Sequence, residues 1–233
     1  MGVFFGTAIT KNYFQKSVAY LSSLKHLKSV QPFCITVGFD FTNKHFFPHV
    51  KFIELDASKI TCNLSSFICL QYGDFAQVFG DDLLIFTDAD AVVQRDLTAS
   101  EIDRFTNYNN TLGLGHNNFQ NDTLATVFPR LIPAYDIHDL EIAEQINLGT
   151  TVVYNTGFIV GKTETFYKLR TVFGQLWQKY STWWKLPAKM QYLICLGIHK
   201  LGINVDLLDY GIHSHGHGRR VRWNVTPHHY LKN

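Results

Sequence analysis

The chain has 233 residues, a length that suits one α/β domain with a sizeable core, and we expect residues 1–233 to form a single domain. Hydrophobic residues make up 46% of the sequence, and this share excludes an intrinsically disordered chain. The formal net charge is +2, which is close to neutral. Charge therefore gives no reason to expect a nucleic-acid or membrane partner, and we expect neither.

The cysteines and the hydropathy of the chain indicate the cellular compartment in which the protein works. The four cysteines lie mostly in apolar segments without a Cys-x-x-Cys pair, which predicts reduced core residues in a cytosol-like compartment: Cys34, Cys62, Cys69 and Cys195. No apolar run approaches the ~20 residues that a membrane span needs. We therefore expect a cytoplasmic protein without a membrane span. The alternative is a lumenal domain whose membrane anchor has been removed.

Strand and helix patterns alternate in the first hundred residues. Apolar β-type runs predict four strands, at Val3–Ala8, Phe33–Phe39, Val50–Leu55 and Leu83–Thr87. Helical patterns lie between them, at Phe14–Leu27 and Leu64–Phe79. Strands separated by helices predict a mainly parallel central sheet flanked by helices, so we expect residues 1–100 to be a nucleotide-binding half.

The second half, residues 101–233, differs from the first in composition and in hydrophobic periodicity. His116–Gln145 is rich in Asn, Asp and Pro without a steady period, which predicts a long loop region that can hold short helices. The remaining patterns predict strands at Thr150–Tyr154, Phe158–Val160 and Ile203–Leu208, and helices at Thr163–Tyr180 and from Pro187 to about Lys200. A Gly- and His-rich stretch, Gly211–Gly218, follows the last of these strands.

Two carboxylates stand one residue apart where a predicted strand ends. Asp88-Ala89-Asp90 follows directly on Leu83–Thr87, so both side chains reach one spot at the carboxyl edge of the sheet. Hard oxygen ligands favour Mn²⁺ or Mg²⁺ over zinc, and an ion held by few protein groups keeps positions free for phosphate oxygens. The pattern therefore predicts a metal site that binds a diphosphate.

Two other interpretations of this segment exist. Asp90 or Asp96 could cap a following helix, because Asp-x-Asp is common and aspartate is a favoured N-cap. Asp88-Ala89-Asp90-Ala91-Val92 also fits the Asp-x-Asp-x-Thr/Val pattern of haloacid-dehalogenase-like phosphatases, in which the first Asp is the nucleophile. That motif usually opens its domain, whereas about a third of this chain precedes it, and no Asp-Asp pair follows.

Four separated motifs make the chain resemble the metal-dependent GT-A glycosyltransferases, and most closely the retaining family 8, which includes glycogenin and bacterial galactosyltransferases. They occur in the family's order and cover most of the chain: Thr7, Thr10 and Tyr13 after the first strand; Asp88-Ala89-Asp90 followed by Asp96-Leu97; Asn155-Thr156-Gly157; and His215 with Gly218 and Trp223. Compact modules of this kind also resemble glycosyltransferases encoded by large algal DNA viruses, which would act in the cytoplasm of an infected host cell.

The resemblance implies a single-domain GT-A fold, and a hexosyltransferase that moves a sugar from a UDP-sugar to a hydroxyl of a glycan or glycoprotein acceptor. Residues 101–233 would bind the donor sugar and the acceptor and carry a C-terminal metal-binding loop. Mn²⁺ or Mg²⁺ would be held by Asp88, Asp90 and His215. Donor-binding residues would be Thr7, Ala8, Thr10, Tyr13, Ala89, Gly218 and Arg222, with the Tyr13 ring stacked on uracil. Asn155 and Gln191 would act at the reacting sugar, with retention of its configuration.

The chain departs from the family at two motifs. Met190-Gln191 stands where the family has Asp-Gln, and Val221-Arg222 stands where it has Lys-Pro. The first departure concerns the residue that contacts donor-sugar hydroxyls, so the sugar is not determined. Two further function classes therefore stay open: a phosphatase or sugar-nucleotide hydrolase, and a non-catalytic module that binds nucleotide sugars.

Overall fold

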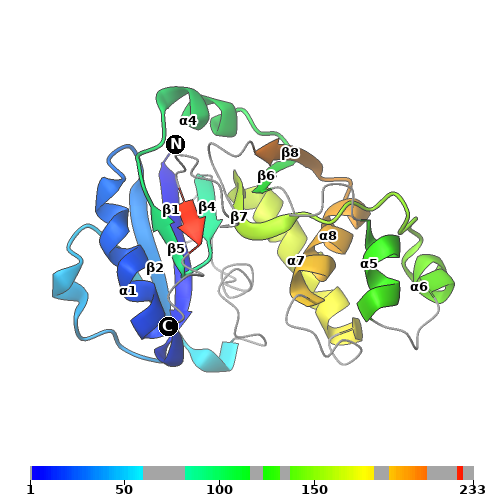
Figure 1. The fold of residues 1–233 in the computed structure, drawn as a ribbon, viewed down its shortest axis with the longest axis horizontal. Coiled ribbons are helices and arrows are strands. Elements are labelled where there is room, and N and C mark those ends of the chain that lie inside the picture. The colour runs from blue at the N-terminus through cyan, green and yellow to red at the C-terminus, as the bar shows by residue number, and fades with distance from the viewer. Residues whose placement is uncertain are drawn as a thin grey trace.

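A seven-stranded mixed sheet with helices on both faces organises the molecule (Figure 1). The computed structural model describes residues 2–59, 82–115, 123–131, 137–180, 189–208 and 225–227. The strand order is β3-β2-β1-β4-β7-β6-β8. Their bounds are β1 Val3–Thr10, β2 Gln31–Val37, β3 Lys51–Leu55, β4 Leu83–Thr87, β6 Thr111–Gly115, β7 Asn155–Lys162 and β8 Asn204–Leu208.

The direction of the strands confirms a mostly parallel sheet. β1, β2, β3 and β4 are mutually parallel, and β6 is parallel to β8. Only β7, of the strands described, runs antiparallel to both of its neighbours, β4 and β6. The first four strands come from residues 1–100 and the other three from the second half, so one continuous sheet joins the two halves. The expected α/β class is thus correct.

The structure describes six α-helices around the sheet. α1 (Phe14–Ser23) and α4 (Ala99–Thr106) pack on one face with the short strand β5 (Ala91–Val93). The other face carries α7 (Thr163–Tyr180) and α8 (Lys189–Lys200). α5 (Leu124–Leu131) and α6 (Ile137–Glu144) lie beyond α8, at the end of the molecule opposite α1 (Figure 1), and contribute to the same core. α5 and α6 are the short helices of the region expected to be largely loop. The helix expected at Leu64–Phe79 lies outside the described residues.

The alternation of side chains along the strands explains the two-faced core. In β4, Leu84 and Phe86 belong to the core on the α7 and α8 side, whereas Leu83 and Ile85 belong to the core on the α1 side. Successive strand residues point to opposite faces of a sheet, and each face here has a helical layer to cover it. β4 can therefore be apolar at every position of its core run, without alternating polar residues.

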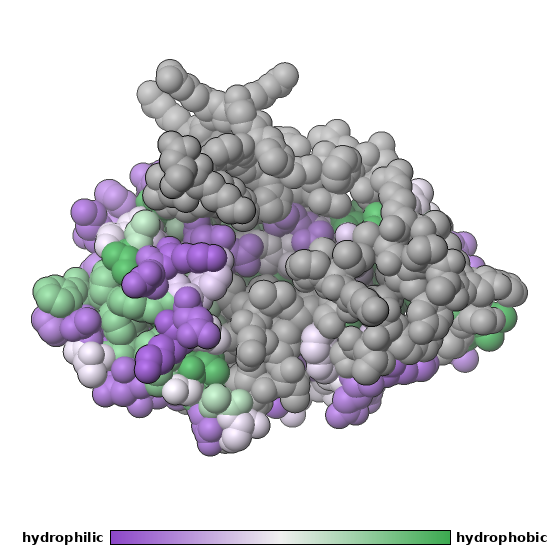
Figure 2. Space-filling model, turned by 60° about the horizontal axis from the view of Figure 1, so that its bottom comes forward, coloured by the Kyte–Doolittle hydropathy of each residue, from purple (hydrophilic) through white to green (hydrophobic). Residues whose placement is uncertain are grey.

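Many of the described aromatic residues are interior. Seven phenylalanines are less than 2% exposed: Phe5, Phe33, Phe86, Phe105, Phe158, Phe166 and Phe173. Phe46 is a clear exception, with 66% of its surface exposed. Figure 2 shows one face of the molecule. Apolar and hydrophilic patches alternate over its described residues, and apolar patches gather at the end where α1 lies in Figure 1.

Within the described ranges, none of the helices combines the length and apolar character that crossing a bilayer requires.

Candidate functional site

Asp88 and Asp90 lie in a tight turn at the carboxyl end of β4. The Asp88 N–H donates to the Gly157 carbonyl at 3.0 Å, and the Asp88 carbonyl accepts from the Ala91 N–H at 3.2 Å. Ala89, between the two carboxylates, is buried with 1% of its surface exposed. Both aspartates are half-buried, so their carboxylates are partly open at the carboxyl edge of the parallel strands.

Burial and the neighbouring carboxylate perturb Asp88. Burial, followed by the negative charge of Asp90, raises the pKa of Asp88 to about 7. Two carboxylates in one partly desolvated place destabilise each other's charged forms, and a divalent cation would remove that cost. Their oxygen chemistry fits Mn²⁺ or Mg²⁺. Within the described ranges, no third Asp, Glu, His or Cys joins the pair to make a complete ligand set.

Tyr13 reaches the same turn from the end of β1. It closes the short 3₁₀ helix η1 (Lys11–Tyr13), and its hydroxyl donates to Asp90 Oδ2 at 3.1 Å. Burial, and then the charge and hydrogen bond of Asp90, raise the pKa of Tyr13 well above its ordinary value, so the phenol stays protonated. The Lys16 ammonium lies over the Tyr13 ring, 5.1 Å from its centroid.

The other residues predicted at the end of β1 differ in position. Thr7 and Ala8 are buried, and Thr7 Oγ1 donates to the Thr87 carbonyl at 2.6 Å. Their side chains therefore belong to the core. Thr10 is half-buried at the N-cap position of η1, without a capping hydrogen bond from its side chain. Of this group, Tyr13 has the side chain that contacts the aspartate pair.

Asn155 and Gly157 bring the start of β7 to the aspartates. Asn155 is buried, and its Oδ1 accepts the Gly157 N–H at 2.8 Å. The β6–β7 register shifts here, because Gly115 pairs with Asn155 although its neighbour Leu114 pairs with Ile159. A β-carbon on Gly157 would lie 2.8 Å from Asp88 Oδ2. The Asn-Thr-Gly segment is therefore an irregular strand start that packs against Asp88, not a free turn.

The remaining predicted residues come from the C-terminal part of the chain. Gln191 is half-buried near the start of α8, and the described contacts do not join it to the aspartates. His215, Gly218 and Arg222 lie outside the described residues. Residues Val225–Pro227 form β9, which pairs antiparallel with β5 so that Pro227 faces Ala91. The described piece of the C-terminal segment therefore lies beside the residues that follow Asp90.

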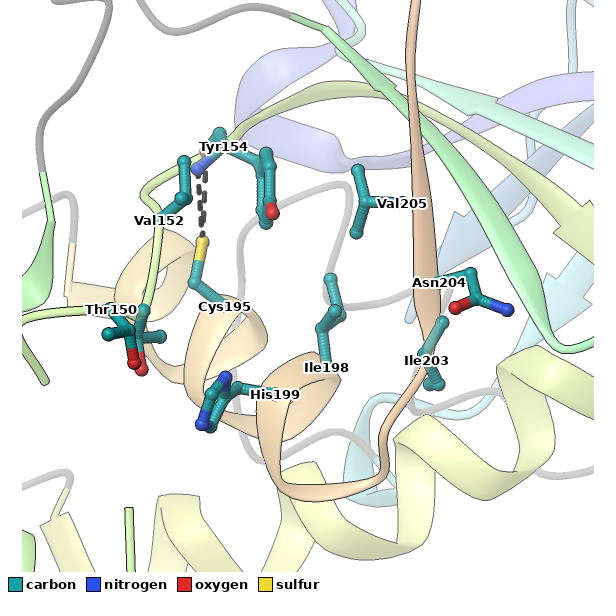
Figure 3. A pocket seen from close by; sticks show the side chains of 10 residues that line it. Thr150, Val152, Tyr154, Cys195, Ile198, His199, Ile203, Asn204 and Val205 are labelled. Carbon is teal, nitrogen blue, oxygen red and sulfur yellow. Dashed lines mark hydrogen bonds between the residues drawn. The ribbon is translucent and has the colours of Figure 1, made fainter. Parts of the chain in front are cut away.

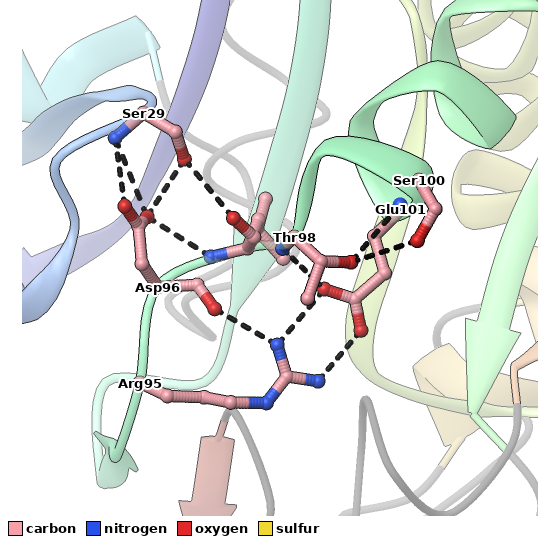
Figure 4. Close-up of polar contacts among 7 residues, drawn as sticks. Ser29, Arg95, Asp96, Thr98, Ser100 and Glu101 are labelled. Carbon is pink, nitrogen blue, oxygen red and sulfur yellow. Dashed lines mark hydrogen bonds and ion pairs between the residues drawn. The ribbon is translucent and has the colours of Figure 1, made fainter.

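A polar network fixes the chain where it leaves the aspartate turn (Figure 4). The Asp96 carboxylate accepts from the Ser29 N–H at 3.0 Å and the Ser29 hydroxyl at 2.7 Å. Asp96 therefore does not cap the next helix. Thr98 does, in a capping box with Glu101, and Arg95 pairs with that same glutamate at 2.6 Å. The network ties the segment after β5 to the loop that follows α1.

A cavity of about 250 Å³ opens beside the residue that precedes Asn155 (Figure 3). Tyr154, His199 and Asn204 are among its lining residues, together with Cys195. The Tyr154 N–H lies 3.3 Å from Cys195 Sγ, and burial raises the pKa of this thiol to about 12. Cys195 is therefore a protonated structural residue and not a nucleophile. Cys34 is likewise free and buried.

Sequence reasoning missed Lys16 and the role of the Tyr13 hydroxyl. Lys16 follows Tyr13 by three residues, a spacing that places both on one face of a helical segment, so the pattern contained the signal. The Tyr13–Asp90 bond joins residues 77 positions apart, and no local pattern predicts it. Neither a comparison with protein-family models nor a search of curated proteins found a match to this chain.

Proposed function

We propose that this protein is a metal-dependent glycosyltransferase that moves a sugar from a UDP-sugar to a hydroxyl of a glycan or other acceptor. One observation carries the proposal: Asp88 and Asp90, Tyr13 and the Asn155–Gly157 segment converge at the carboxyl edge of the sheet. These groups suit a metal-bound nucleotide sugar, because a carboxylate pair can hold the cation and an aromatic ring can stack on a base.

The residues take the following roles in this proposal. Asp88 and Asp90 hold the cation, which, when bound, supplies Lewis-acid stabilisation of the leaving diphosphate. The ring of Tyr13 stacks on the base of the nucleotide. Asn155 orients the donor sugar, and Gln191 supports the positive charge that develops at its anomeric carbon. His215 is the third cation ligand, and Arg222 adds positive charge beside the diphosphate.

The family resemblance favours retention of configuration at the sugar. The acceptor hydroxyl then attacks from the side on which UDP leaves, and a UDP oxygen takes its proton. This path needs no strongly basic side chain. The described residues around Asp88 and Asp90 accord with it, since the groups with a perturbed pKa there are Asp88 and a protonated Tyr13.

A thermal-shift screen of UDP- and GDP-sugars, with Mn²⁺ or with EDTA, tests the proposal. A ligand at about 100 times its dissociation constant stabilises the folded state by about 2.7 kcal/mol, which a thermal shift readily detects. We expect stabilisation by UDP-sugars with Mn²⁺ and a loss of most of it with EDTA. Asp90→Ala should remove the metal-dependent part.

The screened donor is then incubated with acceptor glycans, and UDP release is followed. Release that depends on both metal and acceptor supports a transferase. Release at the full rate without acceptor would identify a hydrolase, and release of inorganic phosphate would identify a phosphatase. Binding without turnover of any donor would leave a nucleotide-sugar-binding module.

A further inference from the structure

The two aspartates are held in different ways. Asp88 is fixed by its backbone, through hydrogen bonds to Gly157 and Ala91, and its carboxylate packs against the Gly157 α-carbon. Among the described residues, the Asp90 carboxylate has one hydrogen-bond partner, the Tyr13 hydroxyl at 3.1 Å. Within the described part of the chain, the Tyr13 side chain, from the end of another strand, is therefore what orients the Asp90 carboxylate.

Tyr13 is well placed to provide that orientation. It ends η1, which follows directly on β1, and β1 is hydrogen-bonded to both β2 and β4. Its backbone is thus anchored to the same sheet that carries Asp88 and Asp90. The phenol is half-buried, so its hydrogen bond with Asp90 is partly protected from competition with water.

One face of the Tyr13 ring is already occupied. The Lys16 ammonium lies over it at 5.1 Å from the centroid, which is a cation–π distance. A nucleobase can stack only on the opposite face while Lys16 keeps this place. The ring of Tyr13 can therefore stack on a base while its hydroxyl bonds to the Asp90 carboxylate, and a substitution can separate the two functions.

We propose that Tyr13 is a positioning residue, whose hydroxyl orients Asp90 toward the divalent cation and the nucleotide diphosphate. The inference rests on the proposed function and deepens it. Removing the hydroxyl while keeping the ring should weaken cation binding and leave metal-free nucleotide binding unchanged. If the ring alone mattered, the same change would have no effect.

The test measures binding of Mn²⁺ and UDP by calorimetry, and binding of Mn²⁺ alone by electron paramagnetic resonance. Tyr13→Phe should weaken Mn²⁺ binding about tenfold, as is usual when a residue that orients a metal ligand is lost. Its affinity for UDP in EDTA should equal that of the wild type. Tyr13→Leu should lose both the metal-dependent gain and the metal-free UDP affinity.

Tyr20→Phe is the matched control. Thr87 lies one residue before Asp88, and its Oγ1 bonds to the Tyr20 hydroxyl at 2.7 Å. The Tyr20 ring is fully buried in the core on the α1 side of the sheet, against which Tyr13 also packs. The same chemical change should lower the melting temperature by about 2–4 °C without changing Mn²⁺ affinity. Equal Mn²⁺ losses in both variants would show a general loosening of the sheet edge and overturn the inference.

The outcomes separate the inference from the proposed function. Wild-type Mn²⁺ affinity in Tyr13→Phe would overturn the positioning role, whatever the reaction is. Wild-type protein that binds Mn²⁺ but no UDP would refute the proposed function, and the Mn²⁺-only comparison would still decide the role of Tyr13. Absence of Mn²⁺ binding in the wild type would overturn both.

Discussion

The carboxylate of Asp88 lies against the α-carbon of Gly157, so closely that a β-carbon there would come within 2.8 Å of Asp88 Oδ2. The same β-carbon would lie 3.0 Å from Asn155 Oδ1. Both clashing atoms are side-chain ends, which can move, so the chain can still fold around an added methyl group. The lack of a side chain at Gly157 therefore determines where Asp88 points.

Gly157→Ala should displace the Asp88 carboxylate at little cost in stability. We expect the Mn²⁺-dependent gain in UDP affinity, measured by calorimetry, to fall about tenfold, as for other changes that misplace a metal ligand. Gly174→Ala is the control, because a β-carbon there meets no atom within 4 Å. In the interior of α7 it should stabilise the fold by about 0.5–1 kcal/mol and leave binding unchanged. Unchanged metal dependence in Gly157→Ala would contradict the packing argument.

The raised pKa of Asp88 makes a prediction about pH. Burial and the charge of Asp90 place this pKa at about 7, above the value for an unfolded chain, so the metal-free folded state holds the proton more tightly. The stability of the metal-free protein therefore falls as the pH rises from the unfolded pKa of an aspartate to about 7, and the loss is complete above it. Asp88→Asn should raise the melting temperature by about 2–6 °C at about pH 8 and change it little at about pH 4.

Asp206→Asn should change the melting temperature in the opposite direction to Asp88→Asn. Burial alone would raise the pKa of Asp206, but hydrogen bonds from Arg104 and Tyr108 outweigh it and hold the pKa below its ordinary value. This carboxylate stabilises the fold above its unfolded pKa, and the contribution is lost as the pH falls through its folded pKa. The variant should melt below the wild type at about pH 8, with a gap that closes in acid. Parallel pH curves for both variants would refute these assignments.

Apolar periodicity predicted the elements that it controls. The expected bounds of β4 and α7, Leu83–Thr87 and Thr163–Tyr180, coincide with the structure, because each has an uninterrupted apolar pattern of the right period. β6 escaped prediction because Gly113 and Gly115 weaken its strand signal. Close packing explains Gly113, since a β-carbon there would lie 2.5 Å from Val160 Cγ1. Tertiary contact overrides local propensity at such a position.

The sequence likewise predicted part of the candidate site and not the rest. The position of Asp88 and Asp90 at a strand end followed from the sequence, because a buried run that stops at two carboxylates has few other arrangements. Their partners did not follow, because the contacts with Tyr13 and Gly157 join strand ends about 70 residues or more from them in sequence. The sequence also contains a helix-start motif at Thr98, because Thr-x-x-Glu is a capping-box pattern and predicts the start of α4.

Glu144 is a further test of the fold, away from the candidate site. Its buried carboxylate accepts from the Lys179 ammonium at 2.6 Å, from the Lys200 ammonium and from the Tyr180 hydroxyl, and so joins α6 to α7 and α8. Glu144→Ala leaves these donors without their acceptor and should destabilise the protein by about 2–3 kcal/mol in denaturant titrations. Glu164→Ala removes an exposed pair with Lys168 and should change stability little. Similar losses in the two variants would contradict a special role for Glu144.

The last prediction concerns the third cation ligand, for which the motif spacing selects His215. This residue lies outside the described residues, but the pairing of β9 with β5 brings a nearby part of its segment beside the residues after Asp90. His215→Ala should weaken Mn²⁺ binding and lower turnover by about 10- to 100-fold, whereas His213→Ala and His217→Ala should change both much less. The three variants remove the same side chain from the same stretch, so the comparison separates position from composition. Greatest sensitivity at His213 or His217, in Mn²⁺ titrations of all three, would show that the spacing to Gly218 and Trp223 is accidental.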